Sequence, residues 1–189
     1  MKLKAEYQFH RFLLLTLLLM LPGCASIPLT TMAHFSGFGP QDIIEIKARE
    51  LRVKATINAS LGIELVKATT LSLGVKTSQG EVSLILGLQA LKQQTIAAKT
   101  GFFSSSPAFS VQYMKLSEQG IIDFEKFQQL VKSKSVKGGS FGAGMDHSNG
   151  DKDQKTKPVD ETVYFSVAIK LAKGDDFVAL IDRFEIEGM

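Results

Sequence analysis

Apolar and polar residues alternate over much of this 189-residue chain, and this pattern constrains its fold most strongly. Each alternating run predicts a β-strand that is covered on one face. If Gln79 and Gly80 form a two-residue turn, apolar residues face each other throughout the segment 71–90. The predicted pairs are Leu71 with Leu88, Leu73 with Leu86 and Val75 with Leu84. A one-residue slip would place these leucines opposite polar residues, so the segment predicts an antiparallel hairpin.

A second hairpin is predicted near the C-terminus, with Gly174 and Asp175 as its turn. Its apolar pairs are Leu171 with Val178, Ile169 with Leu180, Phe165 with Phe184 and Val163 with Ile186. One position breaks the pattern, because Val167 faces Asp182. A carboxylate on an apolar face is paired or titrates abnormally, and such groups are frequent at functional sites. Asp182 is therefore a candidate buried site residue, unless a bulge or a splayed strand end turns it toward solvent.

The remaining periodic segments predict further strands and one helix. Alternation over 44–48 resumes out of phase over 51–57, which predicts strands separated by a bulge, and 110–116 predicts another strand. Asp123 is a suitable N-cap for an amphipathic helix of about three turns. Its apolar face would hold Phe124, Phe127, Leu130 and Val131. The chain is thus expected to be mainly β, a β-rich α+β fold: an antiparallel β-sandwich or a bent sheet with one packed helix.

Two segments lack such periodicity. Residues 24–40 are rich in Ser, Thr, Pro and Gly, and are interpreted as a tether to a single domain over 41–189. Residues 134–158 are interpreted as a flexible loop of that domain. Within this loop, residues 146–153 gather oxygen ligands around His147, but they do not follow the spacing of a calcium-binding EF-hand. No metal site is predicted.

The N-terminal segment has the composition of an export signal. A basic start is followed by an apolar stretch over 12–21, interrupted only by Thr16, and then by Gly23 and Cys24. The apolar stretch is too short for a membrane-spanning helix, which needs about 20 apolar residues. Residues 1–23 therefore predict a cleaved leader, and Cys24 is the only cysteine of the chain.

The segment Leu21-Pro22-Gly23-Cys24 resembles the lipobox of bacterial lipoproteins, with Pro22 a less usual residue at its position. The resemblance implies that Cys24 becomes the mature N-terminus and carries a diacylglyceryl group and an amide-linked acyl chain such as palmitate. Because Ala25 rather than an aspartate follows the cysteine, it also implies the outer membrane, with the domain facing the periplasm. Two or more acyl chains give stable attachment, whereas one does not.

The charge of the predicted mature chain excludes one class of partner. Without the leader, the 22 basic and 19 acidic residues of the full sequence become 19 and 18. A near-neutral balance gives no basic excess of the kind that nucleic-acid binding requires. With its one cysteine committed to lipid, the mature chain has no disulfide and no thiol ligand, and no cofactor is expected.

No catalytic constellation appears, so the chain is not expected to be an enzyme. We expect a lipid-anchored scaffold or docking domain for a protein partner in the cell envelope. The alternative is a carrier that holds a lipid or other apolar ligand between sheet and helix. Candidate contacts for such a partner or ligand are Phe102, Phe103, Phe124 and Phe127. The first two follow Gly101 at an apolar tip, although burial of two phenylalanines at a strand end is the commoner arrangement.

Overall fold

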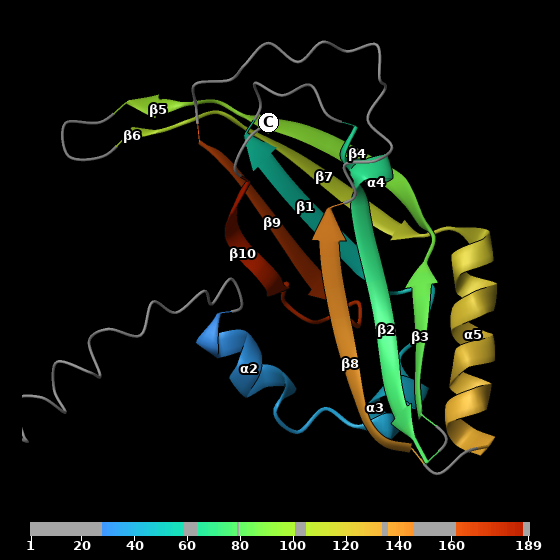
Figure 1. The fold of residues 1–189 in the computed structure, drawn as a ribbon. Helices are drawn as coiled ribbons and strands as arrows, with labels where there is room; N and C mark the ends of the chain where they lie inside the picture. Colours follow the sequence, from blue (N-terminus) through green and yellow to red (C-terminus); the bar gives the residue numbers. More distant parts are fainter. Residues whose placement is uncertain are drawn as a thin grey trace, which may run out of the picture.

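The computed structural model describes residues 28–58, 64–78, 80–100, 105–133, 136–145 and 162–186. Two antiparallel sheets pack against each other, with their strands crossing, and a long helix lies beside them (Figure 1). This is a β-rich α+β sandwich, which confirms the predicted fold class.

The larger sheet has the strand order β10–β9–β1–β7–β4. Its strands are β1 (Arg52–Asn58), β4 (Leu88–Ile96), β7 (Phe109–Leu116), β9 (Val163–Lys170) and β10 (Val178–Ile186). A short ribbon, β5 (Lys99–Thr100) and β6 (Ser105–Ser106), extends the β4–β7 pair. On β1, Val53, Ala55 and Ile57 are buried, while Arg52, Lys54 and Thr56 lie on the opposite face.

The smaller sheet has the order β3–β2–β8, and its inner face completes the core. Its strands are β2 (Thr69–Thr77), β3 (Gly80–Leu86) and β8 (Val136–Met145). Leu71, Leu73 and Val75 of β2 are fully buried in the same cluster as the apolar residues of β1. The short helix α4 (Leu65–Ala68) leads into β2.

Helix α5 (Glu118–Ser133) packs alongside β3 (Figure 1). The predicted apolar face is confirmed, since Phe124, Phe127 and Val131 are buried. The predicted N-cap is wrong, because the helix begins five residues before Asp123. Its first turn is capped by the hydroxyl of Ser117, which accepts a hydrogen bond from the N–H of Gly120 at 3.0 Å.

The first hairpin exists, but its register differs from the prediction by two residues. Leu73 pairs with Leu84 and Thr77 with Gly80, so Gly80 is the first residue of β3 rather than part of the turn. Gly80 has φ +126°, a conformation that favours glycine. A shift of two keeps the same side chains inside, so the inner face was predicted correctly. The hairpin also ends at Leu86, because the chain leaves this sheet at Gly87 and enters the larger sheet as β4.

The second hairpin has the predicted register only at its far end. Phe165 pairs with Phe184 as predicted, whereas Ile169 pairs with Val178 rather than with Leu180. Two irregularities in β10, one between Ala179 and Ile181 and one beyond it, absorb the difference. The connection between the strands consequently spans residues 171–177 instead of two residues.

The predicted tether is wrong from Leu29 onward, because that part of the chain is helical and packed. Helix α2 (Leu29–Phe35) is followed by α3 (Pro40–Glu45), which replaces the strand expected over 44–48. The amide of Gln128 on α5 donates hydrogen bonds to three carbonyl oxygens at the end of α3. These belong to Ile43, Ile44 and Ile46, at 2.7, 3.2 and 2.8 Å.

The predicted loop over 134–158 is wrong for residues 136–145, which form the edge strand β8. Phe141, Ala143 and Met145 alternate on its inner face, opposite Leu73, Leu71 and Thr69 of β2. Glycine and serine occupy the outer face and obscure this alternation. The metal-like run over 146–153 lies outside the described residues.

We predict that Gly120→Ala destabilises the fold by about 1–3 kcal/mol, although alanine ordinarily favours a helix. The added Cβ would lie 2.4 Å from the carbonyl oxygen of Gly87, and backbone cannot move aside as a side chain can. Urea unfolding measures the change. Gly138→Ala is the control, because its Cβ meets nothing within 4 Å and should change stability by less than about 0.5 kcal/mol. Equal effects of the two variants would contradict the prediction.

Candidate functional site

The outer face of the larger sheet, which points away from the core, carries a cluster of cations. Residues directly opposite in neighbouring strands share one face. Arg52 of β1 lies between Lys170 of β9 and Lys115 of β7. In the next row, Tyr113 lies between Lys54 and Lys92 of the flanking strands. We call Arg52, Lys54, Lys92, Lys115 and Lys170 the cationic cluster.

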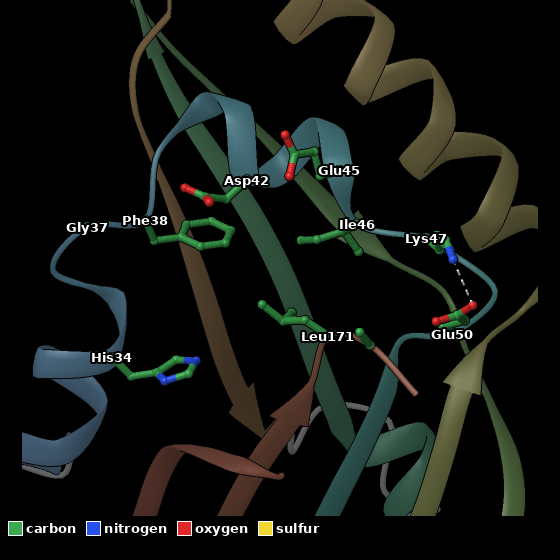
Figure 2. Close-up of a pocket in the computed structure, with 10 residues that line it drawn as sticks. His34, Gly37, Phe38, Asp42, Glu45, Ile46, Lys47, Glu50 and Leu171 are labelled. Carbon is green, nitrogen blue, oxygen red and sulfur yellow. Dashed lines mark hydrogen bonds and ion pairs between the residues drawn. The ribbon is translucent and has the colours of Figure 1, made fainter. Parts of the chain in front are cut away.

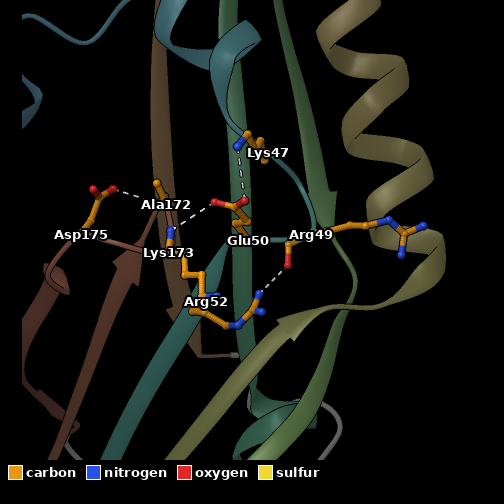
Figure 3. Close-up of polar contacts among 7 residues, drawn as sticks. All are labelled: Lys47, Arg49, Glu50, Arg52, Ala172, Lys173 and Asp175. Carbon is orange, nitrogen blue, oxygen red and sulfur yellow. Dashed lines mark hydrogen bonds and ion pairs between the residues drawn. The ribbon is translucent and has the colours of Figure 1, made fainter.

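Like charges that face each other across a sheet are destabilising, so the cluster needs a physical reason. The guanidinium of Arg52 donates to the carbonyl oxygen of Arg49 at 2.7 Å (Figure 3). It also donates to the carbonyl oxygen of Leu51 at 2.8 Å. None of the four lysine ammonium groups has a carboxylate oxygen within 4.0 Å among the described residues. The four lysine charges of the cluster are therefore not neutralised within the described structure.

Aromatic rings partly compensate for the repulsion. The ring of Phe177 lies 5.3 Å from Nζ of Lys54 and 6.0 Å from Nζ of Lys170. Its other neighbour is Tyr113, at 6.0 Å between ring centroids. Cation–π contacts of this kind contribute about 0.5–1 kcal/mol at exposed sites, so one ring supports two of the cations without removing their charge.

Beside the cluster, the same face is hollowed by about 480 Å³. Its floor is more apolar, with Val111, Phe109 and Ile181 next to Tyr113 and Tyr164. The face thus has a cationic end and an apolar, aromatic end. Such a surface suits an amphiphilic or anionic partner better than a small substrate, because it is open and shallow rather than enclosed.

The sequence-based prediction for Asp182 is wrong, because its side chain is exposed. The irregular pairing of β10 places Ile181, not Asp182, opposite Val167. Arg183 has φ +49°, and its N–H donates to the hydroxyl of Ser166 at 2.9 Å. The bulge considered as the alternative therefore accounts for the carboxylate, which lies at the rim of the hollow in water.

A second hollow, of about 370 Å³, lies between α2, α3 and the β9–β10 connection (Figure 2). Its three carboxylates all accept hydrogen bonds. Asp42 accepts from the N–H of Gly39 at 2.7 Å and Glu45 from the amide of Gln41 at 2.9 Å. Glu50 accepts from Lys47 at 3.4 Å and from the N–H of Lys173 at 3.3 Å (Figure 3). Asp42 and Glu50 hold local backbone in place and Glu45 holds a neighbouring side chain, so we do not interpret the hollow as a catalytic centre.

Within the described ranges, no group of three or more His, Cys, Asp or Glu side chains is placed to hold a metal ion. The helices of the described residues also include none that is long and apolar enough to cross a membrane.

Strand β4 is an open edge of the larger sheet, pairing with β7 alone within the described part of the chain. Seven of its nine residues are exposed, including Leu91 and Ile96 at 49% and 47%. A bulge near Leu91 and the charge of Lys92 interrupt its first half, and both are devices that protect edges. The second half, Gln93–Ile96, is regularly paired and offers its free edge to solvent.

The remaining predicted contact residues fall into two groups. Phe124 and Phe127 are 0% and 6% exposed and fill the interior, so neither is accessible to a protein partner on the surface, and their contact with an internal ligand stays a prediction. Phe102, Phe103 and Cys24 lie outside the described residues. Sequence reasoning missed the cationic cluster, although Arg52 and Lys54 alternate with buried residues of β1, which was the available signal.

The comparisons with known proteins add no relative. No family model matches the chain, and no curated protein and no solved structure matches it.

The second hollow generates a pH prediction. The N–H of Lys173, with a smaller contribution from the Lys47 charge, holds the pKa of the Glu50 carboxyl below its ordinary value of 4.5, against partial desolvation. Since the folded state lowers this pKa, the charged carboxylate stabilises the fold above pH 4.5 and loses that effect as pH falls through the lowered pKa. Glu50→Gln should therefore lower the urea midpoint at pH 7, and by much less at pH 3.

Urea unfolding at both pH values measures the difference between parent and variant. Glu45→Gln, in the same hollow, is the control for removing a negative charge, since within the described residues its carboxylate accepts a hydrogen bond only from the Gln41 side chain. A Glu50→Gln effect that is as large at pH 3 as at pH 7 would contradict the linkage.

Proposed function

We propose that this chain is a lipid-anchored protein of the bacterial cell envelope, attached through Cys24, whose folded domain docks a protein partner without catalysing a reaction. The lipobox-like segment Leu21-Pro22-Gly23-Cys24 supports the anchor and the export of the chain. Outer-membrane attachment with the domain in the periplasm follows from the same resemblance, since Ala25 follows the cysteine.

The packed interior favours docking over the carriage of a lipid between sheet and helix. Phe124 of α5 and Phe165 of β9 are 0% and 1% exposed and belong to one continuous core with the inner face of the smaller sheet. Protein cores are ordinarily close-packed, so a continuous core of this kind leaves little room for an acyl chain. Both hollows described above border this core, at Ile46 and at Val167, and open toward the surface.

The open edge of β4 carries the docking proposal. Exposed edge strands pair readily with extended segments of other chains, and this pairing is a common mode of peptide recognition. In β4 the regular stretch Gln93–Ile96 would provide the backbone donors and acceptors, and Ile96 would add an apolar contact. The partner is therefore expected to contribute an extended strand.

The anchor is tested by Cys24→Ser in the full chain. The parent should enter the detergent phase after Triton X-114 separation and incorporate a labelled fatty acid. The variant should lose the label and its detergent partitioning, because the sulfur that carries the diacylglyceryl group is absent. A variant that partitions like the parent with a processed leader would overturn the anchor.

The docking edge is tested by photo-crosslinking from the side chains of β4. A photoreactive residue at Gln93 or Thr95 should give a discrete adduct in intact envelopes. The same residue at Gln129, an exposed position on α5, should give none and serves as the control. An adduct twice the mass of the chain would identify a second copy as the occupant, and equal labelling from all three positions would exclude β4 as the docking edge.

The carrier alternative has a separate readout. Native mass spectrometry of the protein should show the mass of the acylated chain alone. A reproducibly bound amphiphile, removed by solvent extraction and restored on adding it back, would favour carriage over docking.

A further inference from the structure

We propose that the outer face of the larger sheet lies on the anionic lipid headgroups of the bilayer that holds the anchor. This inference rests on the proposed anchor at Cys24 and adds an orientation and a lipid class to it. It is carried by two independent observations, the length of chain between Cys24 and the folded domain and the unneutralised charge of the cationic cluster.

The link between anchor and domain is short. The predicted tether ended at residue 40, but the chain is helical from Leu29. Helix α2 is fixed to the body, because the hydroxyl of Thr31 donates to the carbonyl oxygen of Ala179 and the ring of Phe35 lies 6.2 Å from that of Phe141. Five residue steps separate Cys24 from Leu29, and a fully extended chain spans about 3.5 Å per residue. The start of α2 therefore stays within about 17 Å of Cys24, the residue proposed to carry the acyl chains.

The cationic cluster is close to this point of attachment. Ala179, which accepts the hydrogen bond from α2, pairs with Ala168, and Ala168 pairs with Lys54. Neighbouring strands lie about 4.8 Å apart. Lys54 is on β1, two strands from β10, which holds α2, so only about 10 Å across the sheet separates Lys54 from β10. On β9, the strand between them, Lys170 lies two residues from Ala168. A domain held this near the bilayer can bring the cationic cluster to the headgroups without unfolding α2.

The chemistry of the face matches such a surface. Each Lys or Arg near an anionic bilayer raises the partitioning of a protein onto that bilayer by about fivefold. The four lysines of the cluster have no carboxylate partner among the described residues and keep their charge for such a contact. Phe177 and Tyr113 stand among the cations, and aromatic rings favour the headgroup region. A sheet lying on the bilayer in this way leaves the β4 edge accessible from the side.

The test uses the purified acylated protein in vesicles of phosphatidylcholine alone or mixed with phosphatidylglycerol. Flotation with the neutral vesicles first establishes the anchor. Amine labelling followed by mass spectrometry then measures each lysine. Labelling of Lys54, Lys92, Lys115 and Lys170 should be about tenfold slower on the mixed vesicles than on the neutral ones. Lys76 and Lys126, exposed on the smaller sheet and on α5, are the internal controls and should not change.

A pair of charge-reversal substitutions distinguishes membrane contact by the sheet face from attachment through the anchor. Lys54→Glu with Lys170→Glu should abolish the protection of Lys92 and Lys115 while flotation is unchanged, and 1 M salt should do the same because it screens charges beyond about 3 Å. Lys76→Glu with Lys126→Glu is the matched control and should keep the protection. Urea unfolding confirms that both double variants are folded.

Three results would overturn the inference while leaving the anchor intact. The first is equal labelling on the two kinds of vesicle, and the second is equal protection of Lys76 and Lys126. The third is protection of the cluster in intact envelopes but not on vesicles, which would assign the face to an acidic protein. If flotation itself fails, the anchor is wrong. In that case the unanchored protein is mixed with excess anionic vesicles. Absence of lysine protection on those vesicles would overturn this inference too.

Discussion

The close contact between the backbones of Gly87 and Gly120 is the constraint on which the two-sheet arrangement depends. The carbonyl oxygen of Gly87 accepts a hydrogen bond from the N–H of Ser117 at 2.9 Å. A Cβ on Gly120 would lie 2.4 Å from that oxygen, and a Cβ on Gly87 would lie 2.7 Å from the hydroxyl oxygen of Ser117. Gly87 is the one residue between β3 and β4, so the chain passes from the smaller sheet to the larger at this point. The same contact positions the first turn of α5, the helix from which Phe124 enters the core.

The sequence predicted which side chains face inward much better than which residues pair. A period of two distinguishes the two faces of a strand, but it cannot distinguish registers that differ by two residues. The first hairpin shows this directly, since Leu73 faces inward as predicted but meets Leu84 instead of Leu86. In β10 the irregular pairing changes the phase within one strand, and this moved Asp182 from the predicted core to the surface.

The segments that were missed have weak apolar signals or depend on distant residues. The alternation of Phe141, Ala143 and Met145 predicts a strand, but glycines on the other face resemble a loop. Helix α3 has a start signal, because Pro40 and Asp42 follow Gly39, but the helix is so short that this signal was not recognised. The candidate site was harder still, because Arg52, Lys115 and Lys170 come from three strands and only their register brings them together.

The packing of α2 has a consequence for the order in which the chain can fold. Thr31 and Ala179 are separated by 148 positions, and Phe35 and Phe38 pack against Phe141 of β8. Contacts of such long sequence separation form late, because the intervening chain must first lose its freedom. During synthesis from the N-terminus, helix α2 therefore cannot complete its docking until β10, the last strand of the described structure, has emerged.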